Sequence, residues 1–193
     1  MTKLMSRSKS WVAFDSGLTP VSRKHLEDTI VNHAAKLGVK LDWLVSHQLT
    51  SGARRIAFTF AASDEKKLNK LLADLNGHFP SFAGDAELSD LVDGSTTKTT
   101  GRVIVMPLEI DISTTVPAEV LIARSAIDSI VAVGEQLPIK AEIQINNFMR
   151  PIFQDGRLEL YVERVAGGYF APVERESPHE CCGGHGDEEP ISL

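Results

Sequence analysis

Between residues 11 and 92, apolar residues at strand spacing alternate with apolar residues at helix spacing, and this order restricts the folds open to the chain. In the first helical run, Leu26, Ile30 and Ala34 form one apolar stripe, and Gly38 is the expected stop. In chain order, the pattern predicts a strand over 11–14, a helix that starts at Thr19-Pro20 or Ser22, strands over 41–49 and 56–60, a helix over 63–76 capped by Ser63, and a strand near 86–92. This order, β-α-β-β-α-β, is that of a ferredoxin-like unit.

A second α+β half is predicted beyond the polar run 93–101, which has no apolar anchor and is the best candidate for a linker. We expect a strand over 104–112, with Pro107 as a bulge or edge signal, a helix from Pro117 to about residue 131, and a strand over 139–146. Asp155-Gly156 between two apolar runs is the strongest hairpin signal in the chain. The order of this half, residues 102–173, is β-α-β-β-β.

The predicted organisation is therefore a flexible N-terminus over 1–10, a ferredoxin-like domain over 11–92, a linker over 93–101, a second α+β domain over 102–173 and a disordered acidic tail over 174–193. The tail holds six acids against one base, Arg175, so it carries −5 of the formal net charge of −6. The nearly neutral remainder offers no general footprint for a phosphate backbone, which argues against nucleic-acid binding.

No apolar run approaches the roughly 20 residues that span a membrane, and no apolar core follows the basic N-terminus as a secretory signal requires. We therefore expect a cytoplasmic protein with no membrane partner. Its two cysteines, Cys181 and Cys182, are adjacent, which favours a reduced pair with a ligand or redox role over a disulfide between distant segments.

The tail carries the most direct chemical signal. Thiolate and imidazole are the ligands that hold zinc, nickel and copper, and the intervening glycines let a short chain fold around an ion. The predicted metal ligands are His179, Cys181, Cys182 and His185. Their spacing differs from the paired C-x-x-C of zinc fingers, which favours a labile carrier site over a rigid structural one. The Cys-Cys-Gly-Gly-His run resembles the cysteine- and histidine-rich tails of nickel-handling prolyl isomerases and of some metallochaperones.

For the other polar residues, a structural role is the stronger interpretation than a role in binding or catalysis. His25, Asp28 and His33 can share one face of the first helix and could hold an ion, but a solvated face is the stronger interpretation. Asp15-Ser16-Gly17 before a helix could hold an anion, although a plain turn needs no ligand. Arg54, Arg55 and Arg150 are interpreted as surface charges, and His47 as a sheet residue.

A turn with Gly17 leads from the first strand to the first helix, and in this respect the first eighty residues resemble an ACT-type regulatory domain. The resemblance implies a ligand-sensing module that binds a small molecule between the subunits of a homodimer.

The sequence contains no Gly-x-Ser-x-Gly elbow and no glycine-rich phosphate loop, which lowers the expectation of an enzyme. The leading hypothesis is a non-catalytic protein that binds or delivers a transition metal through its tail while its body docks on a client protein. The alternatives are the ligand-sensing module and an enzyme whose site lies between the two halves.

Overall fold

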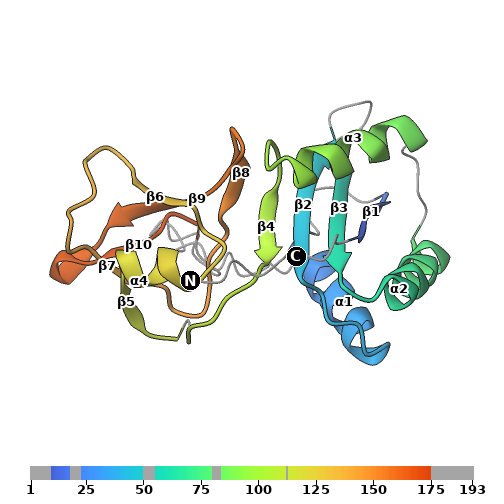
Figure 1. Cartoon of the computed structure of the whole chain (residues 1–193), viewed down its shortest axis with the longest axis horizontal. Coiled ribbons are helices and arrows are strands. Elements are labelled where there is room, and N and C mark those ends of the chain that lie inside the picture. The colour runs from blue at the N-terminus through green and yellow to red at the C-terminus, as the bar shows by residue number, and fades with distance from the viewer. Residues whose placement is uncertain (1–9, 18–22, 50–54, 80–83, 112, 175–193) are drawn as a thin grey trace, which may run out of the picture.

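A computed structural model describes residues 10–17, 23–49, 55–79, 84–111 and 113–174. These residues form a mixed α/β structure in which one sheet runs through two lobes, with β4 between them (Figure 1). The helices are α1 (Arg23–Lys36), α2 (Glu65–His78), α3 (Asp85–Thr96) and α4 (Ala118–Ala123). The strands are β1 (Ser10–Asp15), β2 (Trp43–Leu49), β3 (Arg55–Ala62), β4 (Arg102–Val105), β5 (Thr115–Pro117), β6 (Ser129–Ala132), β7 (Glu142–Gln144), β8 (Ile152–Gln154), β9 (Arg157–Arg164) and β10 (Phe170–Pro172).

The N-terminal lobe, β1 to β3 with α1 to α3, follows the predicted local pattern closely. The strand before α1 and the antiparallel β2–β3 pair are both present, and the predicted stop, Gly38, follows the end of α1 with a φ of 63°. The backbone N–H of Val39 donates to the carbonyl of Ala34 at 2.8 Å, which closes the helix in a Schellman motif. The cap of α2 is Asp64 rather than Ser63, because the Asp64 carboxylate accepts from the backbone N–H of Lys67.

Successive residues of β3 face opposite sides of the sheet, and each side has its own helices. Phe58 and Phe60 are fully buried with the apolar stripes of α1 and α2, in one continuous core. Thr59 points the other way and hydrogen-bonds Ser95 of α3 at 2.6 Å. Helices α1 and α2 therefore cover one face of this lobe, and α3 covers the other.

The ferredoxin-like arrangement is not confirmed. The sheet order is β1-β3-β2-β4, so the fourth strand pairs with β2, whereas a ferredoxin-like unit places its fourth strand beside the first. The strand predicted near 86–92 is also wrong, because these residues belong to α3. Leu88, Leu91 and Val92 have the i, i+3, i+4 spacing of a helix face, which overrides the strand interpretation.

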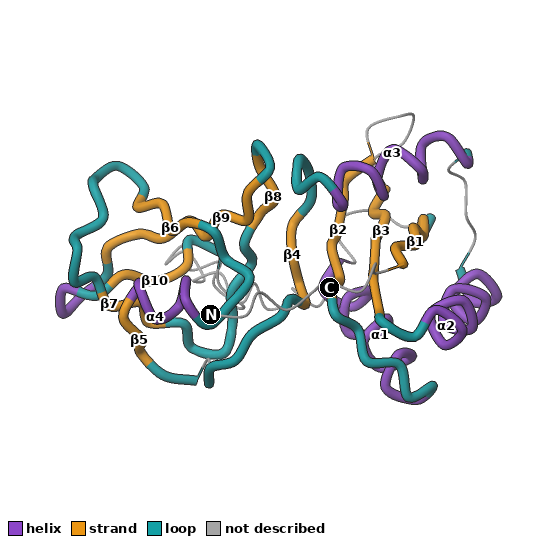
Figure 2. The backbone as a smooth tube through the Cα atoms, viewed as in Figure 1, coloured by secondary structure: helices purple, strands orange, loops and turns teal. Residues whose placement is uncertain are grey.

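The C-terminal lobe, β5 to β10 with α4, continues the sheet in the order β4-β8-β9-β10-β7-β5, and β6 adds to β9 in parallel. Figure 2 shows that strands and loops make up most of this lobe. The predicted hairpin is confirmed, since Asp155 and Gly156 join β8 to β9 with φ angles of 50° and 80°. Ile127 and Ile143 are buried in the core of this lobe.

The long elements predicted for this half are shorter. The strand expected over 104–112 is β4 only, which ends at Val105, two residues before Pro107. The helix expected from Pro117 to about residue 131 ends at Ala123, and residues 129–132 form β6 instead. Just past the helix end, the Ser125 hydroxyl donates to the carbonyl of Leu121 and accepts from the N–H of Ile127. The strand expected over 139–146 is reduced to β7, and Ile139 is 95% exposed.

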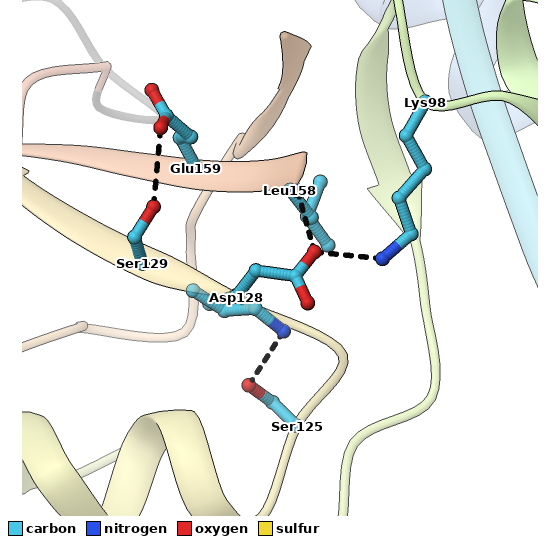
Figure 3. A network of polar contacts seen from close by, with 7 residues as sticks. Lys98, Ser125, Asp128, Ser129, Leu158 and Glu159 are labelled. Atoms are coloured by element: carbon cyan, nitrogen blue, oxygen red, sulfur yellow. Dashed lines mark hydrogen bonds and ion pairs between the residues drawn. The ribbon is translucent and has the colours of Figure 1, made fainter. Parts of the chain in front are cut away.

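Ion pairs join the lobes. The Arg150 guanidinium donates to Glu27 of α1 at 2.8 Å, and both side chains are largely buried. The Lys98 ammonium donates to Asp128 at 2.7 Å, and the same carboxylate oxygen accepts from the N–H of Leu158 (Figure 3). Burial acts to raise the pKa of Asp128, but these two hydrogen bonds and the charges of Lys98 and Arg157 together outweigh it, so the pKa lies below its ordinary value.

Within the residues that the structure describes, no helix is both long and apolar enough to cross a membrane.

Candidate metal centre

Helices α1 and α2 bring together three side chains that can ligate a metal ion. His33 lies in the last turn of α1, and Asp74 and His78 lie four residues apart on α2. One ligand atom from each residue lies within 4.8 Å of the other two. Within the described ranges, this is the one group of three or more His, Cys, Asp or Glu side chains with such proximity.

The packing of the two helices places these residues. Ala34, next to His33, and Leu75, next to Asp74, are both buried in the core between the helices and the sheet. The ligands therefore lie at the rim of this core, where α1 and α2 meet solvent. The side chains of His33 and Asp74 are 18% and 35% exposed, and His78 is exposed.

A hydrogen bond sets the tautomer of the His78 ring. Its Nδ1 lies 2.7 Å from the backbone carbonyl of Asp74, and because a carbonyl only accepts, Nδ1 carries the proton. The lone pair of this tautomer is on Nε2, which is free to bind a metal. A histidine ligand usually donates its other ring N–H to a carbonyl or carboxylate in this way.

The carboxylate of Asp74 faces His33 directly, with 2.5 Å between Oδ2 and the His33 Nδ1. The rings of His33 and His78 also meet edge to face, with centroids 4.9 Å apart. The hydrogen bond from His33 is the main cause that lowers the pKa of Asp74, opposed by some desolvation and helped by the nearby charges of the two histidines and Lys36. Asp74 is thus held as a carboxylate, the form that binds cations.

The group needs a small adjustment to hold an ion. Zinc bonds of ~2.0–2.1 Å in a tetrahedron place ligand atoms about 3.3 Å apart. The His33–Asp74 contact must therefore open, and the wider separations must close. Partly exposed side chains at a helix rim can make such movements by changes of rotamer.

The metal ligands predicted from the sequence, His179, Cys181, Cys182 and His185, lie outside the described residues. Of the group proposed on the first helix, only His33 takes part, and His25 and Asp28 are exposed elsewhere on α1. His33 reaches its partners across the helix pair instead of along its own helix.

The remaining candidates have structural contacts. The carboxylate of Asp15 is fully buried, accepts from the N–H of Gly17 at 2.9 Å and pairs with Arg55, so it closes a turn as the plain interpretation holds. Arg55 and Arg150 are not surface charges, because their side chains are 14% and 15% exposed and paired with carboxylates. His47 is a buried sheet residue, as predicted.

Sequence reasoning missed Asp74 and His78. An available signal was their i, i+4 spacing beside the Leu68-Leu71-Leu75 stripe, which places both on one side of α2. Their proximity to His33, 41 residues earlier than Asp74, depends on how the two helices pack.

Comparison with protein-family models, curated proteins and solved structures gave no match.

Proposed function

We propose that this protein binds a transition-metal ion at His33, Asp74 and His78 and acts as an accessory or delivery protein. The observation that carries the proposal is the convergence of two imidazoles and one carboxylate from two helices on one point. Two nitrogens and one oxygen suit borderline divalent ions such as zinc and nickel.

Three protein ligands leave at least one coordination position for water or for a ligand from another molecule. The exposed rim position lets such a ligand approach. An ion held this way exchanges more readily than one in a closed four-ligand site, which favours delivery over a purely structural role.

The C-terminal set, His179, Cys181, Cys182 and His185, is the second part of the proposal. Its thiolates favour zinc, nickel or copper(I), so zinc and nickel suit both sets. In this scheme the protein is cytoplasmic, its acceptor is a client protein, and its acidic tail and nearly neutral remainder do not engage nucleic acid. A homodimer that holds a ligand between subunits belongs to the alternative, the ligand-sensing module.

The test is calorimetric titration of the metal-free full chain with zinc and with nickel. His78→Ala and Asp74→Asn remove ligands from the helix pair, the double change Cys181→Ser/Cys182→Ser removes the tail thiolates, and His25→Ala is the matched control on the exposed part of α1. We expect two classes of site in the wild type. His78→Ala should abolish one class, the double cysteine change the other, and His25→Ala neither.

Cobalt(II) spectra separate the two sets independently, because only thiolate ligation produces an intense sulfur-to-metal band. The cysteine-free protein should still bind cobalt, but without that band. If its binding is unchanged by His78→Ala, the centre between α1 and α2 does not exist. If the wild type and the cysteine-free protein bind identically, the tail has no role.

A further inference from the structure

A cavity of about 330 Å³ lies where the two lobes meet. Strand β2 pairs with β4 only as far as Ser46, opposite Arg102, and then runs on to Leu49. The chain before β4 turns away at Gly101, which has a φ of 121°. The cavity occupies this divergence, and β8 of the other lobe closes it with Ile152 and Phe153.

The wall at Gly101 is main chain by necessity. A Cβ built there would lie 2.4 Å from Cγ1 of Val45 and 2.6 Å from Cε1 of His47, both closer than real atoms approach. Only glycine combines this close approach with a positive φ. The shape of the cavity on this side is therefore set by the fold, independently of a movable side chain.

The charge on the cavity lining is of one sign. Arg102 is the one charged residue among the described lining residues, and no carboxylate is among them. Neutral hydrogen-bonding groups come from Ser46, His47, Gln48 and Thr100, and Ile152 and Phe153 of β8 complete the lining beside Gly101. A guanidinium with no acid in the cavity suits an anion, and the apolar part suits a short hydrocarbon chain.

A carboxylate already holds Arg102 from outside the cavity. Oε2 of Glu174 lies 2.8 Å from Nη1 of Arg102, and the two side chains are 35% and 37% exposed. Glu174 does not line the cavity. An anion inside would therefore share the guanidinium with Glu174 and be repelled by its charge.

We propose that this cavity binds a small monocarboxylate with an aliphatic chain, that Arg102 is the group that recognises the carboxylate, and that Glu174 weakens binding as a built-in competitor. An amino acid suits the site less, because no acid among the described lining residues is available for its ammonium group. The site is separate from the proposed metal centre and does not depend on it.

The experiment is a ¹⁵N–¹H NMR titration of the metal-free full chain with 4-methylpentanoate. The neutral amide of the same acid tests the need for charge, and inorganic phosphate tests whether any anion suffices. We expect saturable shifts at Thr100 and Gly101 with the carboxylate, and weaker or no binding of the amide and of phosphate. Equal affinity for phosphate would overturn the carboxylate assignment.

Two variants at one ion pair should move the affinity in opposite directions. Arg102→Gln should weaken binding by about ten-fold or more, since a hydrogen bond to a charged group is lost. Glu174→Gln should tighten it by roughly two- to five-fold, since an exposed opposing charge is removed. Arg164→Gln, which breaks the exposed Arg164–Glu135 pair outside the cavity, is the matched control and should change nothing.

If Arg102→Gln does not fold, Glu174→Gln still tests the site, because this variant leaves the guanidinium in place. Absence of shifts at residues 100–102 in the wild type would overturn the site. Unchanged or weaker binding by Glu174→Gln would overturn the competition.

Discussion

Acidification from pH 8 to pH 5 should lower the free energy of unfolding by about 2 kcal/mol through His47 alone. The imidazole is 5% exposed in β2. Its Nε2 bonds the hydroxyls of Thr59 at 2.9 Å and Ser95 at 3.1 Å, and Nδ1 has no partner among the described residues. Burial lowers the pKa of His47 from 6.5 to about 4.

The folded and unfolded states take up the proton of His47 at different pH values. The unfolded chain protonates near pH 6.5, whereas folded His47 stays neutral until about pH 4. The contribution to stability is therefore complete above pH 6.5 and is lost as the pH falls toward 4. With about 1.36 kcal/mol per pKa unit, this difference in pKa lowers the free energy of unfolding by about 2 kcal/mol at pH 5.

The assay is urea unfolding in the presence of a chelator, followed by the fluorescence of Trp11 and Trp43, whose rings lie 6.3 Å apart. His47→Gln should remove this part of the pH dependence, while the exposed-histidine control His25→Gln should retain it. The lowered pKa values of Asp74 and Asp128 act below their ordinary 3.8, outside this window. If the wild type and His47→Gln lose the same stability between pH 8 and pH 5, the claim that folded His47 stays neutral is refuted.

Four further substitutions test packing and polar pairing. Gly101→Ala should cost about 1–3 kcal/mol, because its Cβ would overlap Val45, whereas Gly77→Ala in α2 meets nothing and should stabilise by about 0.5–1 kcal/mol. Chemical denaturation of both variants measures the contrast, and equal effects would contradict the close approach. Glu27→Gln leaves its buried arginine partner without a carboxylate and should cost about 3 kcal/mol, and thermal stability near that of the wild type would show that the pair is solvated. Phe58→Ala should cost about 3–5 kcal/mol because the side chain is fully buried, and a loss below 1 kcal/mol in urea titration would mean that its face of β3 is misassigned.

The parts of the fold that depend on neighbouring residues could be predicted from the sequence. Alternation over β2 and β3 identified both as strands, and Asp155-Gly156 identified the hairpin between β8 and β9. These features are set within a few residues, where turn chemistry and side-chain period act directly.

The features that depend on long-range packing could not be predicted. Nothing local specifies that β4 adds to β2 instead of β1, because both edges of the β1-β3-β2 sheet are open to it. The long apolar runs of the C-terminal half led to predicted strands and a predicted helix that are too long. In the structure, the short strands β6, β8 and β10 all pair with β9. The group His33, Asp74 and His78 was missed for the same reason, because His33 meets Asp74 only after α1 and α2 pack on one sheet face.

X-ray absorption spectroscopy of the zinc-loaded Cys181→Ser/Cys182→Ser protein tests the central proposal most directly. Without tail thiolates, the ion should be surrounded by nitrogen and oxygen at ~2.0–2.1 Å, with the multiple scattering of two imidazoles. His78→Ala added to this protein should remove the ion or leave the signature of one imidazole. A protein that takes up no zinc after the cysteines are replaced, or one whose spectrum is unchanged by His78→Ala, would contradict a metal centre at His33, Asp74 and His78.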